Sequence, residues 1–296
     1  MSKIAVIGLG GVGGYIAACL AKTSHEIVGF ARGEHLKKIK KDGIKVIEDT
    51  KEWSVSLEAK NLNEAEGYFD IVLFCVKSYD LKTSYEAIRN HIDSNTIVIS
   101  FANGVEHGDE LREWSGSKVL DGSVYILSHI QDSGVIRKKG KVFAAVFGGE
   151  EKATQTLKSI FDEAELRSKS PKDIKTAIWK KYLFISAFAT LTSYYNKSIG
   201  YVIEHHYEEC QSILKEIADV AKALNIDIDT EIQKALDIAK GLPYDASTSM
   251  YLDFKNKKIN ELETLSGYIV KEAKIHNLKV PIMEKMYEGL QCKKRD

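Results

Sequence analysis

The chain has 296 residues, of which 44% are hydrophobic and 28% are charged, a composition that is ordinary for a globular protein of about two domains. Its 42 basic residues balance its 42 acidic residues, so no net field favours a nucleic acid or a membrane surface as a partner. The four cysteines are widely separated and include no C-x-x-C pair. They indicate neither a disulfide framework nor a zinc site, and reduced thiols in the cytoplasm are expected.

A glycine-rich motif follows the first predicted strand, which covers residues 4–7, and an apolar helix is predicted directly after it, over 15–21. In a G-x-G-x-x-G motif the first glycine permits a tight turn, the second lets the backbone approach a pyrophosphate, and the third lets the helix pack close to the strand. The N–H groups that begin the helix would face the phosphates. A glycine-rich turn without a ligand is the alternative. The predicted cofactor-binding residues of this segment are Gly8, Leu9, Gly10, Gly11, Val12 and Gly13.

The rest of the first half alternates predicted strands and helices, as a parallel sheet requires. Two continuous apolar runs, 70–77 and 96–101, are typical of strands that are buried on both faces. The two short strands 44–47 and 53–57 are expected to form a small hairpin. The predicted strands are 25–30, 44–47, 53–57, 70–77, 96–101, 118–120, 122–128, 134–137 and 142–147, and the predicted helices are 34–41, 81–91 and 154–164.

The strand pattern ends near residues 168–173, and the second half is predicted to be helical. Its predicted helices are 174–195, 208–224, 230–239, 257–276 and 282–290. The expected architecture is therefore an α/β, Rossmann-type dinucleotide-binding domain over 1–168, followed by an all-helical substrate and catalytic domain over 174–296.

The uncharged N-terminal segment raises the question of export. Residues 4–21 carry no charge, and the segment that ends at Cys19 resembles a lipoprotein cleavage box. Five glycines interrupt this segment, however, and cleavage would remove the glycine motif, so we expect a cytoplasmic protein. No other stretch approaches the roughly 18 apolar residues that a membrane span needs.

The end of the second predicted strand distinguishes between the two nicotinamide dinucleotides. An NAD site usually has an acidic residue there, which bonds the ribose 2′-hydroxyl. This chain has Ala31 and Arg32 instead, and the nearest acid is Glu34. An arginine at this position can pair with a 2′-phosphate, so NADP is the expected cofactor. The alternative is that Arg32 is an ordinary surface cation.

Several short segments, in their order and spacing, resemble the ketopantoate reductase (2-dehydropantoate 2-reductase) family over most of the chain. Besides the glycine motif they are 31–36, Val76-Lys77, Asn103-Gly104-Val105, Trp179-Lys180-Lys181, Ser249-Met250 and Glu261-Leu262-Glu263, the last ending at Gly267. The resemblance implies an NADPH-dependent reduction of a 2-oxo acid to a 2-hydroxy acid. It also implies that Lys181 and Glu261 are the active-site residues.

The chemistry of Lys181 can be argued independently. Hydride transfer to a ketone leaves negative charge on oxygen, and a lysine ammonium can stabilise that charge and supply a proton. Lys181 lies in a largely apolar stretch, 179–188, where a charge needs a partner or extends to water. Glu261 is predicted to lie on a helix, where a solvated surface carboxylate is the simpler interpretation. The resemblance instead places Glu261 against the substrate or Lys181.

Three further residues are predicted to bind cofactor or substrate. Asn103 follows a strand at the carboxyl edge of the sheet and could contact either ligand, or be only a turn residue. Lys77, also at a strand end, could lie near the nicotinamide ribose or substrate, or be a solvated strand cap. Ser249 could bind the substrate, or be a helix N-cap.

The chain departs from the family at the substrate pocket. Typical members carry asparagines four and eight residues after the lysine, where this chain has Ile185 and Ala189, and a common glutamine is replaced by Asp80. A pocket without its polar partners loses discrimination for a substrate hydroxyl. The small-molecule substrate that the resemblance implies is 2-dehydropantoate, reduced to pantoate in pantothenate biosynthesis. The missing polar partners make a more apolar 2-oxo acid the alternative.

Two other functions stay open. One is a different dehydrogenase on the same scaffold, of opine or polyol type, and the other is a non-catalytic NADP(H) sensor, against which the presence of Lys181 and Glu261 argues. The histidines lack metal-ligand spacing, so no metal is expected. The helical half could form a homodimer.

Overall fold

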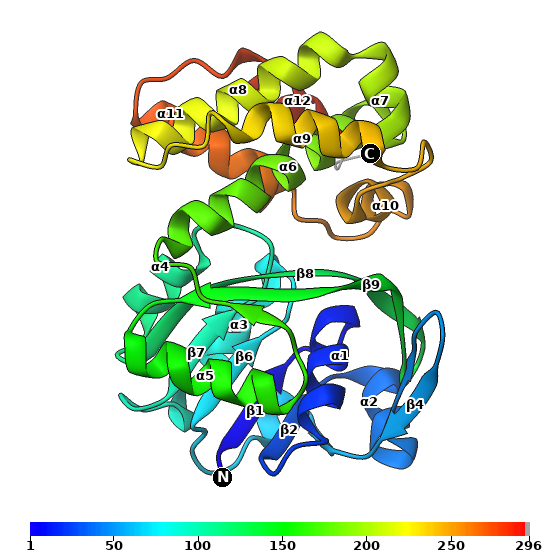
Figure 1. Ribbon diagram of the computed structural model, residues 1–296, viewed down its shortest axis with the longest axis vertical. Helices are drawn as coiled ribbons and strands as arrows, with labels where there is room; N and C mark the ends of the chain where they lie inside the picture. The colour runs from blue at the N-terminus through cyan, green and yellow to red at the C-terminus, as the bar shows by residue number, and fades with distance from the viewer. Residues whose placement is uncertain (294–296) are drawn as a thin grey trace. The chain divides into compact units, whose positions relative to one another are not determined.

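The computed structural model describes residues 1–293 of the chain (Figure 1). The chain forms two compact units. The first comprises Met1–Ala102 and Glu106–Ile174, and the second comprises Asn103–Val105 and the described residues from Lys175 onward. Residues 103–105 lie inside the predicted 1–168 domain, but they group with the helical part of the chain.

A parallel sheet forms the centre of the first unit. Its strands run in the order β5-β2-β1-β6-β7-β8, which corresponds to the 3-2-1-4-5-6 order of a doubly wound dinucleotide-binding fold. The predicted Rossmann-type fold is confirmed. The bounds are β1 Lys3–Ile7, β2 Glu26–Phe30, β5 Glu58–Lys60, β6 Ile71–Phe74, β7 Ile97–Ser100 and β8 Lys118–Asp132.

A long antiparallel ribbon extends this sheet. β8 pairs with β9 (Val135–Gly148), so the four short strands predicted over this region are in fact two long ones with register shifts. β3 (Ile44–Ile47) pairs with β9 in parallel and with β4 (Glu52–Val55) in antiparallel orientation, which confirms the predicted hairpin. The short β10 (Ser168–Lys169) pairs with β9 in parallel orientation, with Ser168 opposite Ala145, on the edge of β9 that does not pair with β8.

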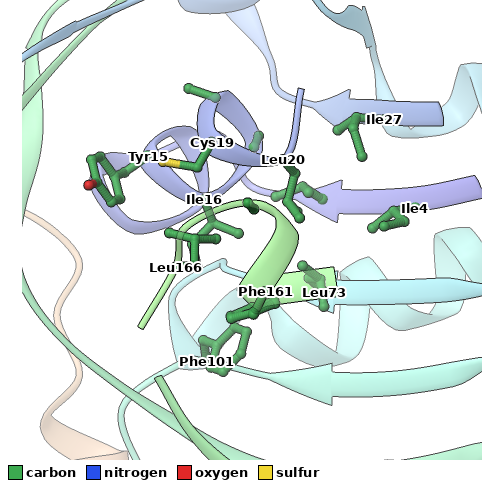
Figure 2. Close-up of a cluster of buried hydrophobic side chains, with 14 of the residues drawn as sticks. Ile4, Tyr15, Ile16, Cys19, Leu20, Ile27, Leu73, Phe101, Phe161 and Leu166 are labelled. Atoms are coloured by element: carbon green, nitrogen blue, oxygen red, sulfur yellow. The ribbon is translucent and has the colours of Figure 1, made fainter. Parts of the chain in front are cut away.

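Helices cover both faces of the sheet, because alternate residues of each buried strand point to opposite sides. In β1, Ile4 and Val6 join one core cluster, with residues of α1 and α5, and Ala5 joins another, with residues of α3 and α4. Figure 2 shows the first cluster, where residues of α1 pack against Leu73 and Phe161. The helices are α1 Gly11–Leu20, α2 Gly33–Asp42, α3 Ser78–Ile88, α4 His107–Trp114 and α5 Glu151–Glu163, with 3-10 turns η1 Leu62–Glu64 and η2 Arg89–His91.

The second unit is helical and has its own buried core, as predicted. The short helices α7 and α10 of this unit, and α4 of the first unit, are not among the helices predicted from the sequence. The predicted 257–276 helix is wrong at its start: residues 258–261 are not helical, and the wide π-turn η3 precedes α11. The elements are α6 Ile174–Tyr195, α7 Ile199–His205, α8 Tyr207–Ala223, α9 Glu231–Gly241, α10 Ser249–Lys255, η3 Glu263–Gly267, α11 Tyr268–Ile275 and α12 Pro281–Lys293.

Within residues 1–293, no helix is both long and apolar enough to cross a membrane.

Candidate active site

The glycine motif forms the turn between β1 and α1. Gly8 has a φ of +92°, a backbone conformation that L side chains rarely adopt, and its amide donates to Phe30 O at 2.9 Å. Gly10 is the N-cap of α1, and Gly14 N donates to Gly10 O at 2.7 Å. The turn therefore lies at the carboxyl ends of β1 and β2, where open α/β sheets bind ligands.

The positions of this turn require glycine for different steric reasons. A Cβ on Gly13 would lie 2.0 Å from Gly8 O, and one on Gly11 would lie 2.5 Å from Ser128 O, so both positions need the absence of a side chain for packing. A Cβ on Gly10 would meet nothing within 4 Å. The open space at Gly10 fits the close approach of a pyrophosphate to the backbone.

Leu9 and Val12 contribute to this turn mainly through their backbone. Leu9 is 1% exposed and belongs to the core cluster on one face of the sheet, and Val12 packs against that cluster. Of the six residues predicted here, these two have side chains that pack into the protein interior. Leu9 N also donates to Phe30 O at 3.2 Å and Leu9 O lies 2.8 Å from His35 Nε2, so Leu9 shapes the turn, whereas Val12 could offer its N–H to a phosphate.

Arg32 and Lys77 occupy matching positions, each as the N-cap residue of the helix after a sheet strand. The Arg32 side chain is 83% exposed, and its Nη2 lies 3.1 Å from Asp80 Oδ2 in an ion pair. Lys77 is partly buried, and Asp80 N donates to Lys77 O at 2.9 Å. A carboxylate therefore stands beside the arginine that was predicted to meet a 2′-phosphate. The sequence showed Asp80 only as a departure from the family.

Lys181 lies in the second turn of α6 and interacts with two other predicted site residues, Asn103 and Glu261. Lys181 Nζ donates to Asn103 Oδ1 at 3.2 Å, which joins two predicted site residues that are 78 positions apart. Removal from water lowers the pKa of Lys181 from its usual 10.5 to about 8, and the charge of Glu261 acts against that fall. The side chain is thus a protonated acid at pH 7 that gives up its proton more easily than a surface lysine.

Glu261 is not the solvated helix residue that the sequence alone favoured. It is 2% exposed and precedes Leu262, the residue at which the helix begins. The neighbouring Asn260, 5% exposed, accepts the Leu262 amide at 3.3 Å through its side chain. A buried carboxylate requires partners, and the electrostatic coupling to Lys181 is one.

Ser249 lies on a different helix from Lys181. It is the exposed first residue of α10, and the alternative that it caps this helix is wrong, because Thr248 is the N-cap and accepts Tyr251 N at 3.3 Å. Thr248 Oγ1 lies 2.9 Å from Thr192 Oγ1 on α6. Thr192 is eleven residues after Lys181, roughly 16 Å along the helix at 1.5 Å per residue.

On the face of α6 that carries Lys181, the residues that follow at intervals of four are apolar. Residues spaced by four lie on one face of a helix, so Ile185 and Ala189 continue the line that begins at Lys181. Ile185 is partly buried, and Ala189 is 3% exposed. Neither side chain can hydrogen-bond a substrate hydroxyl.

One group of side chains in the first unit has distances that would suit a metal ion. Ligand atoms of Glu106, His107 and Glu110 lie within 4.8 Å of one another. His107 Nδ1 is 2.9 Å from Glu110 Oε2, so a hydrogen bond already accounts for part of this cluster. The expectation of no metal stays a prediction.

Comparison with known proteins identifies the family. Residues 4–149 match the family model "Ketopantoate reductase PanE/ApbA", and residues 173–294 match "Ketopantoate reductase PanE/ApbA C terminal". The structure of 2-dehydropantoate 2-reductase from Porphyromonas gingivalis W83 is 30% identical, with 98% of this chain and 99% of that chain covered and a TM-score of 0.86.

Two other relatives extend the range of activities. An uncharacterized oxidoreductase, YkpB, of Bacillus subtilis is 28% identical over 98% of each chain. The structure of D-mandelate dehydrogenase with NADH and anilino(oxo)acetate has a TM-score of 0.90 at 20% identity, with 99% of this chain and 98% of that chain covered, which shows a shared fold. The chain belongs to the ketopantoate reductase family and is an oxidoreductase.

Proposed function

We propose that this protein reduces a 2-oxo acid to a 2-hydroxy acid with NADPH, and that Lys181 supplies the proton. One observation carries the proposal: the ammonium of Lys181 is largely withdrawn from water, bonded to Asn103 and coupled to the buried Glu261. A bound reduced nicotinamide supplies the hydride. We assign the cofactor to residues 1–168 and the acid–base chemistry to 174–296, with Asn103 added to the latter.

Lys181 has two tasks in this proposal. Its positive charge attracts the carbonyl oxygen, where negative charge develops as hydride adds to the carbon. Its proton then moves from Nζ to that oxygen, which gives the 2-hydroxy acid and a neutral amine. A pKa of about 8 suits this step, because the group is protonated at pH 7 yet is a better donor than an unperturbed lysine.

Asn103 and Glu261 prepare Lys181 for that transfer. The Asn103 amide oxygen accepts one N–H of the ammonium and so fixes its direction. The negative charge of Glu261 favours the protonated form against the effect of burial. We propose Lys181 and Glu261 as the catalytic residues, and both of them with Asn103 and Ser249 as substrate-binding residues.

The cofactor proposal rests on the turn between β1 and α1 and on Arg32. The turn offers the N–H groups that begin α1, at residues 11–13, and open space at Gly10, and Arg32, Lys77 and Asn103 would contact the rest of the dinucleotide. An exposed arginine after β2 favours the 2′-phosphate of NADPH. The carboxylate of Asp80 opposes that preference, since a 2′-phosphate has to compete with it for Arg32.

The substrate proposed first is 2-dehydropantoate, reduced to pantoate, a step of pantothenate biosynthesis. Membership of the family and the name of the P. gingivalis relative support it. A second candidate is a 2-oxo acid with an apolar side chain, which the apolar stripe of Ile185 and Ala189 favours. An opine- or polyol-type dehydrogenase and a non-catalytic NADP(H) sensor are the remaining alternatives.

The test is NADPH consumption by purified protein with 2-dehydropantoate, a series of branched and linear 2-oxo acids, and no substrate, in parallel. Oxidation of NADPH with at least one 2-oxo acid, to the corresponding hydroxy acid, supports the proposal. Tight NADPH binding without turnover of any carbonyl supports the sensor instead. The predicted homodimer stays a prediction, which the sedimentation of the purified chain would test.

A further inference from the structure

A wide helical turn begins two residues after Glu261. η3 (Glu263–Gly267) is a π-helix, a rare conformation that occurs mostly as single turns and often at functional sites. Thr264, Leu265 and Ser266 in this turn are buried. A π-turn interrupts the regular i→i−4 bonding of a helix, so its backbone needs other partners where water is excluded.

Two hydroxyl groups of α6 bond backbone carbonyls of this turn, and a third bonds one of its side chains. Tyr182 Oη donates to Thr264 O at 2.7 Å and also lies 3.2 Å from Leu265 O, and Ser186 Oγ donates to Leu265 O at 2.6 Å. Thr190 Oγ1 lies 2.7 Å from the Ser266 hydroxyl.

The spacing of these hydroxyls aligns them on one face of α6. The spacing between them is four residues: they are Tyr182, Ser186 and Thr190, and each is at most 1% exposed. The first of them directly follows Lys181. The same helix therefore carries Lys181 and, on an adjacent line, the three groups that hold η3.

A hydrogen bond links the anchored turn to Glu261 itself. Leu265 N donates to Glu261 O at 2.9 Å, while Leu265 O accepts from Tyr182 and Ser186. The backbone of Glu261 is thus tied to a residue that two α6 side chains hold in place.

We propose that Tyr182, Ser186 and Thr190 are positioning residues of the active site, which anchor η3 to α6 and thereby fix Glu261 relative to Lys181. The inference deepens the proposed function, because it rests on Lys181 and Glu261 acting together. In this arrangement, loss of an anchoring hydroxyl removes a hydrogen bond between α6 and η3. The turn then shifts, and the carboxylate moves away from the ammonium.

The matched control is Ser193→Ala. Ser193 lies on α6 and is 4% exposed, as buried as Ser186 to within a few per cent, but its hydroxyl makes no hydrogen bond among the described residues. The two serine-to-alanine changes remove the same atom from the same helix. Only the change at Ser186 removes a bond to η3.

The experiment reads the Lys181 ammonium directly, without substrate. Lysines labelled with ¹³C at Cε are titrated by NMR in the full-length protein, and Lys181→Arg identifies the Lys181 signal. Glu261→Gln is expected to lower the pKa of Lys181 by about one unit, because an opposite charge within a few ångströms supports the charged form. Ser186→Ala and Tyr182→Phe are expected to lower it in the same direction by about half a unit, whereas Ser193→Ala leaves it unchanged.

A double variant separates positioning from a general loss of structure. In the Glu261→Gln protein, addition of Ser186→Ala is expected to lower the Lys181 pKa no further, since the carboxylate it would displace is absent. Should Ser186→Ala be unstable, Tyr182→Phe carries the test alone, because it keeps the ring that packs against Trp179 and Tyr268.

Two results would overturn the inference. The first is that Glu261→Gln changes the pKa of Lys181 but Ser186→Ala and Tyr182→Phe do not. The second is that Glu261→Gln itself leaves the pKa of Lys181 unchanged. Both are obtained without turnover, so failure of the proposed reaction, seen as no NADPH consumption with any 2-oxo acid, is a separate outcome. Where a substrate is turned over, kcat of Ser186→Ala and Tyr182→Phe should fall about tenfold while the NADPH Kd is kept.

Discussion

The Lys181 ammonium donates a hydrogen bond to Asn103 Oδ1 at 3.2 Å, although 78 positions separate the two residues. Asn103 follows β7 in the chain, yet residues 103–105 group with the helical unit that carries Lys181. The hydrogen bond between Lys181 and Asn103 therefore lies within the second unit, although Asn103 comes from the first half of the sequence.

The pH dependence of the reduction should follow the titration of Lys181. Only the ammonium form donates a proton, and the pKa of Lys181 is about 8, so kcat should be maximal at lower pH and fall as the pH rises through about 8. Glu261→Gln removes a charge that raises this pKa, so the alkaline limb should move to lower pH. Steady-state rates between pH 6 and 10 measure both. An alkaline limb that is the same in the wild type and Glu261→Gln would contradict the coupling.

Two glycines of the dinucleotide turn should respond differently to alanine. Gly10→Ala adds a methyl group in open space, so the free energy of unfolding should change by less than about 0.5 kcal/mol. Its NADPH affinity should nevertheless fall at least about tenfold, because the methyl occupies the place of the pyrophosphate. Gly13→Ala forces a Cβ to 2.0 Å from Gly8 O and should destabilise the fold by about 1–3 kcal/mol.

Urea unfolding and fluorescence titration with NADPH measure these two effects separately. Unchanged NADPH affinity in Gly10→Ala would contradict the placement of the cofactor at this turn. Unchanged stability in Gly13→Ala would contradict the packing of α1 on β1.

Asp80→Asn should increase the preference for NADPH over NADH. The carboxylate of Asp80 pairs with Arg32 at 3.1 Å and would repel a 2′-phosphate. Its removal frees the guanidinium and should change the ratio of the two dissociation constants by about tenfold, the equivalent of roughly 1.4 kcal/mol. Equilibrium binding of both cofactors gives the ratio directly.

Glu86→Gln, a change at an exposed acid on the same helix, serves as the control for Asp80→Asn and should leave that ratio as it is. If the neutralisation of Asp80 alters NADPH and NADH binding equally, Asp80 does not contribute to the choice between them.

Ile185→Asn should move substrate selectivity towards hydroxylated 2-oxo acids. The residue lies one helical turn after Lys181 and is partly buried, so an amide there can bond a substrate hydroxyl that isoleucine cannot. The ratio of kcat/KM for 2-dehydropantoate to that for an unhydroxylated branched 2-oxo acid should rise about 10- to 100-fold.

The same chemical change at Ile238, which is 57% exposed on α9, provides the comparison and should leave selectivity unaltered. An equal loss of both activities in Ile185→Asn would show that the residue supports folding and does not select the substrate.

Much of the fold was accessible from the sequence, because strong local patterns specify it. The uniform apolar runs of β6 and β7 predict strands that are buried on both faces, and the glycine spacing predicts the turn into α1. The long β8–β9 ribbon was predicted in fragments. Its distal part is mostly exposed, so residues 128–132 lack the alternation that marks a half-buried strand.

The sequence named the candidate site residues, but it could not show how buried they are or which groups contact them. Whether Glu261 is buried depends on where the helix begins, and helix termini are the least certain part of a pattern. The wide turn η3 cannot be predicted locally, since its carbonyls are satisfied by Tyr182 and Ser186, about 80 positions earlier in the chain. The capping residue of α10 is Thr248 and not Ser249, because two adjacent hydroxyl residues suit an N-cap equally.

The most direct test of the central claim is the rate of NADPH oxidation by wild type and Lys181→Met at pH 7, with the 2-oxo acid that the wild type uses best. Loss of a general acid typically costs 10²–10⁴-fold, so kcat should fall by at least about 100-fold while the NADPH Kd changes little. A wild-type protein that oxidises NADPH with no 2-oxo acid, or a Lys181→Met protein that keeps wild-type kcat, would contradict the account.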